Sequence, residues 1–147
     1  MKQNKEVKKA MYLYEKYYTE CQEGIAQLLE YYQKGNKKVA LWGGGLKGVA
    51  FLEIFDPNMQ KVSFVYDNNE KKWGSKLPTG HQIKCLEHSS DDVVNAVLLM
   101  NNNYETEVAG QLIAAEKKVA LINVDSVILG ELALEEILDM YGKEIGE

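Results

Sequence analysis

The first 33 residues carry apolar side chains at alternating three- and four-residue spacing. The repeat runs through Met11, Tyr14, Tyr18, Cys21, Ile25, Leu28 and Tyr32. Because an α-helix turns every 3.6 residues, this spacing predicts a long amphipathic helix over residues 7–33. Its apolar stripe either packs on the domain that follows or forms a seam for self-association or for a partner protein. Gly35 and Asn36 predict the end of the helix, because both residues tolerate the left-handed conformation.

From residue 36 onward, short apolar runs alternate with helical patterns. We expect strands at residues 38–42, 61–67, 81–84, 96–100 and 118–123, with helices at residues 46–55 and 104–116. A last helix is expected after Asp125 and Ser126, carrying Leu129, Leu132, Leu134, Ile137 and Leu138. This alternation predicts an α/β fold, a Rossmann-like three-layer parallel sheet preceded by the long N-terminal α-helix. We expect residues 1–35 to form the helix and residues 36–147 the Rossmann-like domain.

A glycine-rich turn joins the first predicted strand to the helix after it. Its sequence, Gly43-Gly44-Gly45-Leu46-Lys47-Gly48, is a G-x-G-x-x-G pattern. In such a turn Gly43 permits the bend, Gly45 lets the backbone approach a ligand, and Gly48 lets helix and strand pack closely. The N–H groups and dipole at the start of the helix favour a bound phosphate or carboxylate. A P-loop is excluded, because Lys47 precedes Gly48 and no Ser or Thr follows that lysine.

An acidic residue, Asp67, ends the second predicted strand. It lies 19 residues after Gly48, where dinucleotide-binding domains carry an acid that binds both ribose hydroxyls. Its charge would repel a 2′-phosphate, which favours NAD over NADP. The alternative is that the glycines serve strand and helix packing alone, and that Asp67 caps a turn with Asn68 and Asn69.

Three asparagines, Asn101, Asn102 and Asn103, follow the fourth predicted strand. They lie at the carboxyl edge of the sheet, where ligands of open α/β domains bind, and their amides both donate and accept hydrogen bonds. Asparagine is equally common in turns and helix caps, so both interpretations stay open. Lys47 offers a similar choice between a phosphate contact and a solvated surface position.

No metal site is expected. His81, Cys85 and His88 are near one another in sequence, but extended residues four positions apart lie about 13 Å apart, too far to share one ion. Neither histidine has an identifiable nucleophile or carboxylate partner in the sequence.

The composition narrows the classes of partner. With 17 basic and 22 acidic residues the net charge is −5, which argues against binding to nucleic acid. The two cysteines form no C-x-x-C pair, and no apolar run reaches the length of a membrane span or signal-peptide core. We therefore expect a cytoplasmic protein with no membrane contact.

The segment over residues 38–124 resembles the C-terminal domain of the sugar C-methyltransferase family, enzymes that methylate nucleotide-linked deoxysugars. The resemblance rests on residues 39–48 with the glycine turn, on Val65-Tyr66-Asp67-Asn68-Asn69 with Lys72 and Gly74, and on Leu77-Pro78-Thr79-Gly80. In that family the domain is a Rossmann unit that follows a domain for S-adenosylmethionine and a zinc-binding region, and it helps hold the nucleotide sugar. The resemblance therefore implies that the loop from Lys72 to Gly80 contacts a ligand.

Several features depart from the family pattern. We expect neither a preceding cofactor domain nor a cysteine cluster for zinc, and the tyrosine-rich helix occupies the place where the catalytic domain would join. The order Leu77-Pro78-Thr79-Gly80 also differs from the usual Leu-Pro-Gly-Thr. We therefore expect a domain that binds a nucleotide or nucleotide sugar without catalysing methyl transfer by itself.

Two alternatives of other classes stay open. The first is a small enzyme that uses NAD or S-adenosylmethionine, and the second is an interaction module built on the N-terminal helix. The candidate cofactor-binding residues are Gly43, Gly44, Gly45, Leu46, Lys47, Gly48, Asp67, Asn68, Asn101 and Asn102. The candidate substrate-binding residues are Lys72, Pro78, Gly80 and His81.

Overall fold

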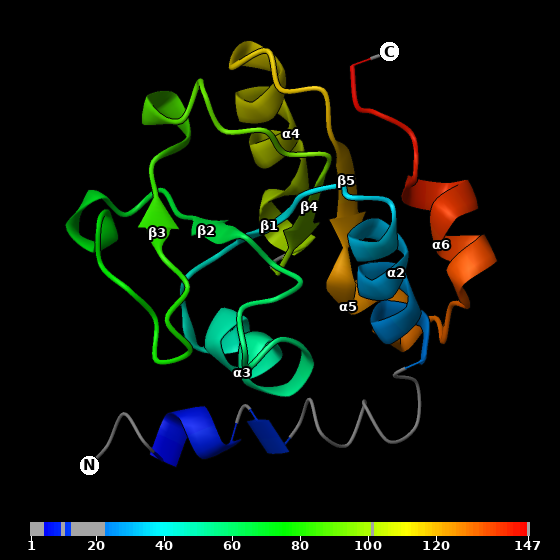
Figure 1. Cartoon of the computed structure of the whole chain (residues 1–147), viewed down its shortest axis with the longest axis horizontal. Helices are drawn as coiled ribbons and strands as arrows, with labels where there is room; N and C mark the ends of the chain where they lie inside the picture. Colours follow the sequence, from blue (N-terminus) through cyan, green and yellow to red (C-terminus); the bar gives the residue numbers. More distant parts are fainter. Residues whose placement is uncertain (1–4, 10, 13–22, 101, 147) are drawn as a thin grey trace.

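Five parallel strands form one sheet in the computed structural model, which describes residues 5–9, 11–12, 23–100 and 102–146. The strands are β1 (Val39–Trp42), β2 (Phe64–Tyr66), β3 (Ile83–Lys84), β4 (Ala96–Leu99) and β5 (Ala120–Asn123). Their order across the sheet is β3-β2-β1-β4-β5 (Figure 1). The chain builds outward from β1 first toward β3 and then, through β4, toward β5. This is the Rossmann-like α/β arrangement that the sequence predicts.

Helices cover both faces of the sheet, because successive strand residues point to opposite sides. On one face, Trp42, Tyr66 and Leu99 share an apolar cluster with Leu112 of α4 (Glu105–Ala114). On the other face the strands pack against α2 (Glu23–Lys34), α3 (Leu46–Phe55), α5 (Val124–Leu129) and α6 (Leu134–Tyr141). Figure 1 shows α4 on one side of the sheet and α2, α3 and α5 on the other. The predicted three layers are present.

The N-terminal region is helical wherever the structure describes it. Residues 5–9 and 11–12 are helical, and α2 follows at Glu23–Lys34. The predicted continuity of one helix depends on residues 13–22, and these lie outside the described residues, as do Tyr14, Tyr18 and Cys21. Ile25, Leu28 and Tyr32 of the stripe are buried in the core. The helix ends as predicted, because Asn36 takes a left-handed conformation with φ 54°.

One prediction about the C-terminal region is wrong. The segment after β5 forms two helices, α5 and α6, rather than one. The cap of α5 is Asn123, whose Oδ1 accepts a 3.1 Å hydrogen bond from the Ser126 N–H. The helix cannot continue because Gly130 ends it and Glu131 turns left-handed at φ 50°. In the described part of the chain, no helix is long and apolar enough to cross a membrane.

Candidate functional site

The glycine turn bends the chain sharply between β1 and α3. Gly43 has φ 119°, a conformation that L side chains rarely adopt, and its N–H donates a 2.9 Å bond to the Tyr66 carbonyl. Gly45 stands at the N-cap of α3 and supplies no side-chain cap. The first N–H groups of a helix lack partners within it, so the start of α3 presents backbone donors beside the carboxyl edge of the sheet.

The three motif glycines have different surroundings. A Cβ on Gly48 would lie 2.1 Å from the Gly43 carbonyl oxygen, which no side chain could avoid. A Cβ on Gly45 would meet no atom within 4 Å. Gly48 is therefore required by packing, whereas Gly45 faces open space through which a ligand could approach the backbone.

Asp67 is hydrogen-bonded directly to the glycine turn. Its Oδ2 accepts a 2.8 Å hydrogen bond from the Gly44 N–H, and its Oδ1 accepts a 2.8 Å bond from the Asn69 N–H. Lys72 Nζ lies 4.0 Å from Oδ2, and Trp73 Nε1 donates to the Asp67 carbonyl at 2.6 Å. The side chain thus caps a turn and also stands beside the glycines. A carboxylate has about four lone-pair sites, so it can still accept bonds from a ligand.

The glycine-turn cavity has a volume of about 520 Å³ and is lined by Gly44, Gly45 and Leu46 together with Lys72 and Pro78. Lys76 and Glu6 also contribute to its walls. The structure therefore brings part of the glycine turn and part of the Lys72 to Gly80 loop to one hollow. Two lysines against one glutamate give the described lining a net positive charge.

A second hollow, the switch-point cavity, lies where the chain reverses its direction across the sheet. Its volume is about 460 Å³, and Gly43, Asp67, Asn68, Leu99 and Tyr104 are among its lining residues. Open α/β sheets bind ligands at this position, between the carboxyl ends of strands such as β1 and β4. Asp67 and Asn68 are placed there as well.

Several predicted residues lie elsewhere. Lys47 Nζ pairs with Asp125 Oδ2 at 3.1 Å, which links α3 to α5. Gly80 takes φ 97° and lies against Met59, outside both cavities. Asn102 begins a short 3-10 helix, Asn102–Tyr104, after β4. Asn101 lies outside the described residues.

His81 is not brought to the glycine turn. Its side chain is fully buried, its Nε2 lies 3.0 Å from Asp56 Oδ2, and its Nδ1 contacts Thr79 Oγ1. It joins the segment before β3 to the segment after α3.

Asp56, directly after α3, is a buried carboxylate. Besides His81, it accepts bonds from the N–H groups of Gln60, Lys61 and Val62 at 2.9, 3.0 and 2.8 Å. Burial alone would raise the pKa of Asp56, but the His81 and backbone hydrogen bonds hold it below its ordinary value. An acid directly before a proline turn, with a histidine 25 residues later, gives no periodic signal by which this pair could be found.

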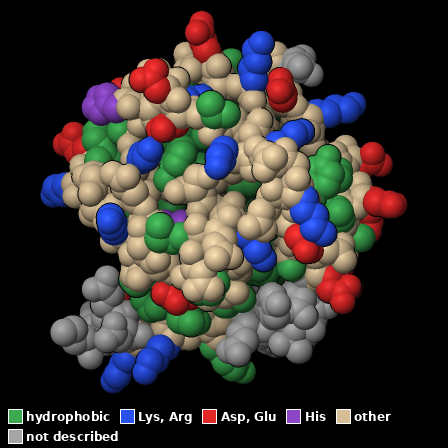
Figure 2. All heavy atoms as spheres, in the orientation of Figure 1, with side chains coloured by type: hydrophobic (Ala, Val, Ile, Leu, Met, Phe, Trp, Pro, Cys, Tyr) green, Lys and Arg blue, Asp and Glu red, His purple; other side chains and the backbone are tan. Residues whose placement is uncertain are grey.

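Charged side chains are mixed over the face drawn in Figure 2, where basic and acidic groups alternate without a continuous basic patch. Among the described residues, no group of three or more His, Cys, Asp or Glu side chains is placed to hold a metal ion.

Comparison with known proteins gives one family match. The family model described as C-methyltransferase C-terminal domain matches residues 3–123. No match was found among curated protein sequences. The family match includes both the glycine turn and Asp67.

Solved structures give similarities at low sequence identity. The UDP-D-quinovosamine 4-dehydrogenase of Vibrio fischeri is 19% identical with a TM-score of 0.49, over 75% of this chain and 93% of that one. RSP, a Rex-family repressor, solved in complex with beta-NADH, is 16% identical with a TM-score of 0.44. That similarity covers 59% of this chain and 46% of the repressor.

Proposed function

The chain belongs to the C-methyltransferase C-terminal domain family, and from this premise we propose that it binds a nucleotide or nucleotide sugar at the glycine turn. Its role is to hold and orient this ligand, and methyl transfer requires a catalytic domain. The observation that carries the proposal is the hydrogen bond between Gly44 and Asp67, which fixes an acceptor for sugar hydroxyls beside a helix N-terminus.

In the proposed complex the phosphates lie at the start of α3. The helix dipole and the free N–H groups of its first turn attract an anion. The first turn of α3 contains no acidic residue that would oppose one. Gly45 is exposed and leaves room for close approach, and the side chains of Lys72 and Lys76 add positive charge from the facing loop.

In the proposed complex the ribose lies against Asp67. The Gly44 and Asn69 N–H groups hold the carboxylate in position, and 14% of its side chain stays exposed. Ribose hydroxyls donate hydrogen bonds to a carboxylate held in this way, and a 2′-phosphate would be repelled by it. Asp67 therefore favours ligands with a free ribose edge.

The test is a thermal-shift screen followed by calorimetric titration. The ligands are UDP- and dTDP-sugars, NAD and S-adenosylmethionine. Binding of one class raises the melting temperature in a saturable manner, because a ligand that binds only the folded state stabilises it. Stabilisation by NAD or S-adenosylmethionine alone would favour the small-enzyme alternative.

Two variants and a matched control locate the binding. Gly45→Val closes the open approach to the backbone, and Asp67→Ala removes the carboxylate; both abolish the shift. Gly110→Val is the control, because a Cβ on Gly110 also meets no atom within 4 Å, yet Gly110 lies in α4 away from the turn. No shift with any ligand, in a protein that is well folded, would reject the proposed function and favour the interaction module.

A further inference from the structure

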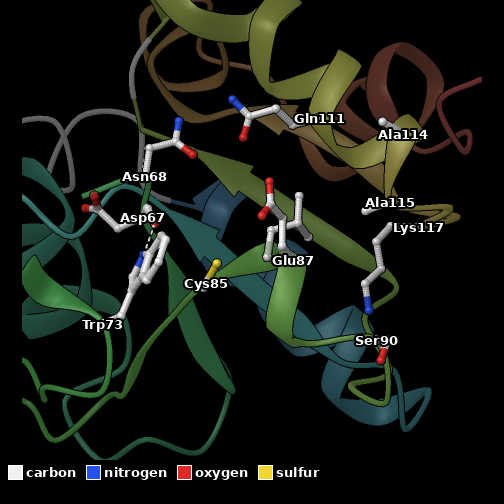
Figure 3. Close-up of a pocket in the computed structure, with 11 residues that line it drawn as sticks. Asp67, Asn68, Trp73, Cys85, Glu87, Ser90, Gln111, Ala114, Ala115 and Lys117 are labelled. Atoms are coloured by element: carbon white, nitrogen blue, oxygen red, sulfur yellow. Dashed lines mark hydrogen bonds between the residues drawn. The ribbon is translucent and has the colours of Figure 1, made fainter. Parts of the chain in front are cut away.

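A third hollow lies on the α4 side of the sheet, between α4 and the segments that follow β2 and β3 (Figure 3). We call it the Trp73 pocket. Its volume is about 510 Å³, and its walls include Trp73, Leu86, Glu87, Gln111 and Ala114. Pockets of this size hold small organic ligands.

Asp67 connects the Trp73 pocket to the glycine turn. Asp67 and Asn68 line both this pocket and the switch-point cavity. The same carboxylate accepts the Gly44 N–H bond and lies 4.0 Å from Lys72 Nζ, and both of those residues line the glycine-turn cavity. Asp67 therefore borders the Trp73 pocket and contacts the glycine turn, although it does not itself line the glycine-turn cavity.

The walls of the pocket combine apolar surface with converging polar groups. Trp73, Leu86 and Ala114 supply the apolar surface. In Figure 3 the polar ends of Asn68, Gln111 and Glu87 point into the same space. Two amides that donate and accept, with a carboxylate that accepts, match the mixed edge of a nucleobase.

The segment after β3 is held firmly against the rest of the domain. Lys117 Nζ donates to the carbonyls of Ser89 and Asp92 at 2.7 and 2.8 Å. Lys84 Nζ binds both carboxylate oxygens of Asp92 at 3.1 and 3.2 Å. These bonds keep the wall that carries Leu86 and Glu87 in place, so the pocket is preformed.

The Trp73 pocket and the glycine-turn cavity differ in the charge of the residues that line them. Asp67 and Glu87 face a single lysine, Lys117, whose ammonium group already donates two hydrogen bonds. Phosphates are therefore disfavoured there and favoured beside Lys72 and Lys76. A neutral, flat group that donates hydrogen bonds suits the Trp73 pocket.

We propose that the Trp73 pocket holds the nucleobase of a nucleotide whose sugar contacts Asp67 and whose phosphates lie at the glycine turn. This inference rests on the proposed function. Glu87 accepts a hydrogen bond from the base edge, and Gln111 completes the recognition. The base stands against the apolar wall that includes Trp73 and Ala114.

The experiment compares five nucleoside monophosphates, AMP, CMP, GMP, UMP and dTMP, with ribose 5-phosphate, which lacks a base. At least one nucleotide binds tighter than ribose 5-phosphate by about tenfold or more in calorimetric titration. The same nucleotide quenches tryptophan fluorescence, and the quench disappears in Trp73→Phe, where Trp42 is the remaining tryptophan. The fluorescence measurement uses the unaltered chain first, so it does not depend on a variant that folds.

A pair of variants on α4 tests whether the base lies in the Trp73 pocket. Ala114→Phe fills the pocket from an exposed helix position and weakens nucleotide binding about tenfold or more, while ribose 5-phosphate binds as before. Ile113→Phe is the control, because Ile113 is 48% exposed and lines a different hollow with Tyr141 and Ile145.

The outcomes separate this inference from the proposed function. Nucleotides that bind the wild type and Ala114→Phe equally, without a Trp73 signal, would overturn the base pocket while leaving the glycine-turn site intact. Equal binding of nucleotides and ribose 5-phosphate would overturn it as well. No binding of any nucleotide or nucleotide sugar would overturn both.

Discussion

The backbone N–H of Gly44 donates a 2.8 Å hydrogen bond to Asp67 Oδ2, across 23 residues of sequence. This bond joins the turn after β1 to the end of β2. A Cβ on Gly44 would lie 3.1 Å from the same oxygen, so a larger residue there would require the carboxylate to shift by a few tenths of an ångström. The position of the carboxylate and the shape of the turn are therefore coupled, and a change in either alters the site.

Asp67→Asn is expected to weaken ligand binding and to lower stability slightly. An amide has one acceptor oxygen, so the N–H of Gly44 or of Asn69 loses its partner, at a cost of about 1 kcal/mol. Ligand affinity falls about tenfold, because the charged acceptor for the sugar is gone. Titration calorimetry and urea unfolding measure the two effects. Asp91→Asn, at an exposed position, is the control, and unchanged affinity in Asp67→Asn would contradict the role of the carboxylate.

Gly48→Ala and Gly45→Ala are expected to differ sharply in stability. The new methyl at position 48 would lie 2.1 Å from the Gly43 carbonyl oxygen, so the helix must shift, at a cost of about 3 kcal/mol. The methyl at position 45 meets nothing within 4 Å, and we expect a loss of at most about 1 kcal/mol, because alanine is a poorer N-cap residue than glycine. Urea denaturation of both variants gives the comparison. Equal midpoints would show that α3 can move away from the turn without loss.

Lys72→Met is expected to weaken the binding of anionic ligands more than Lys47→Met. Lys72 lines the glycine-turn cavity, and loss of its charge costs about 1 kcal/mol of binding free energy, or roughly fivefold in affinity. Lys47 pairs with Asp125 and is 59% exposed, so its removal changes stability by about 0–1 kcal/mol. Calorimetric titration of both variants with one nucleotide sugar measures the loss of affinity in each. A larger loss in Lys47→Met would place the phosphates on the other side of α3.

Local patterns in the sequence explain which parts of the fold could be predicted. The helix expected at residues 46–55 is α3, Leu46–Phe55, because a glycine turn marks its start and Asp56 with Pro57 marks its end. The break between α5 and α6 was missed, because the leucine repeat continues through a turn whose key feature is the left-handed backbone of Glu131. Periodicity reports which face is buried, and it does not report every change in backbone direction.

Which candidate residues belong to the site was harder to predict, because some of them pair with residues that are distant in sequence. The motif and the strand order place Asp67 beside the glycines, and spacing rules anticipate this. The pairing of Lys47 with Asp125, 78 residues away, and of His81 with Asp56, 25 residues away, has no local signature. Both pairs depend on how α3 packs against its neighbours, and this is settled only by the tertiary fold.

Asp56 is expected to make folding stability depend on pH in the acid range. Its pKa in the folded protein is lower than its ordinary value of 3.8, so its contribution to stability is complete above that value and is lost as the pH falls through the folded pKa. Asp56→Asn removes this dependence and, by leaving buried donors such as the Val62 N–H poorly satisfied, destabilises the protein by about 2–3 kcal/mol at neutral pH. Urea unfolding at several pH values from about 7 down to about 2 gives the two curves, with Asp91→Asn as the exposed control. The curves of wild type and Asp56→Asn converge in acid if the carboxylate acts as described, and parallel curves would show that other groups determine the acid sensitivity.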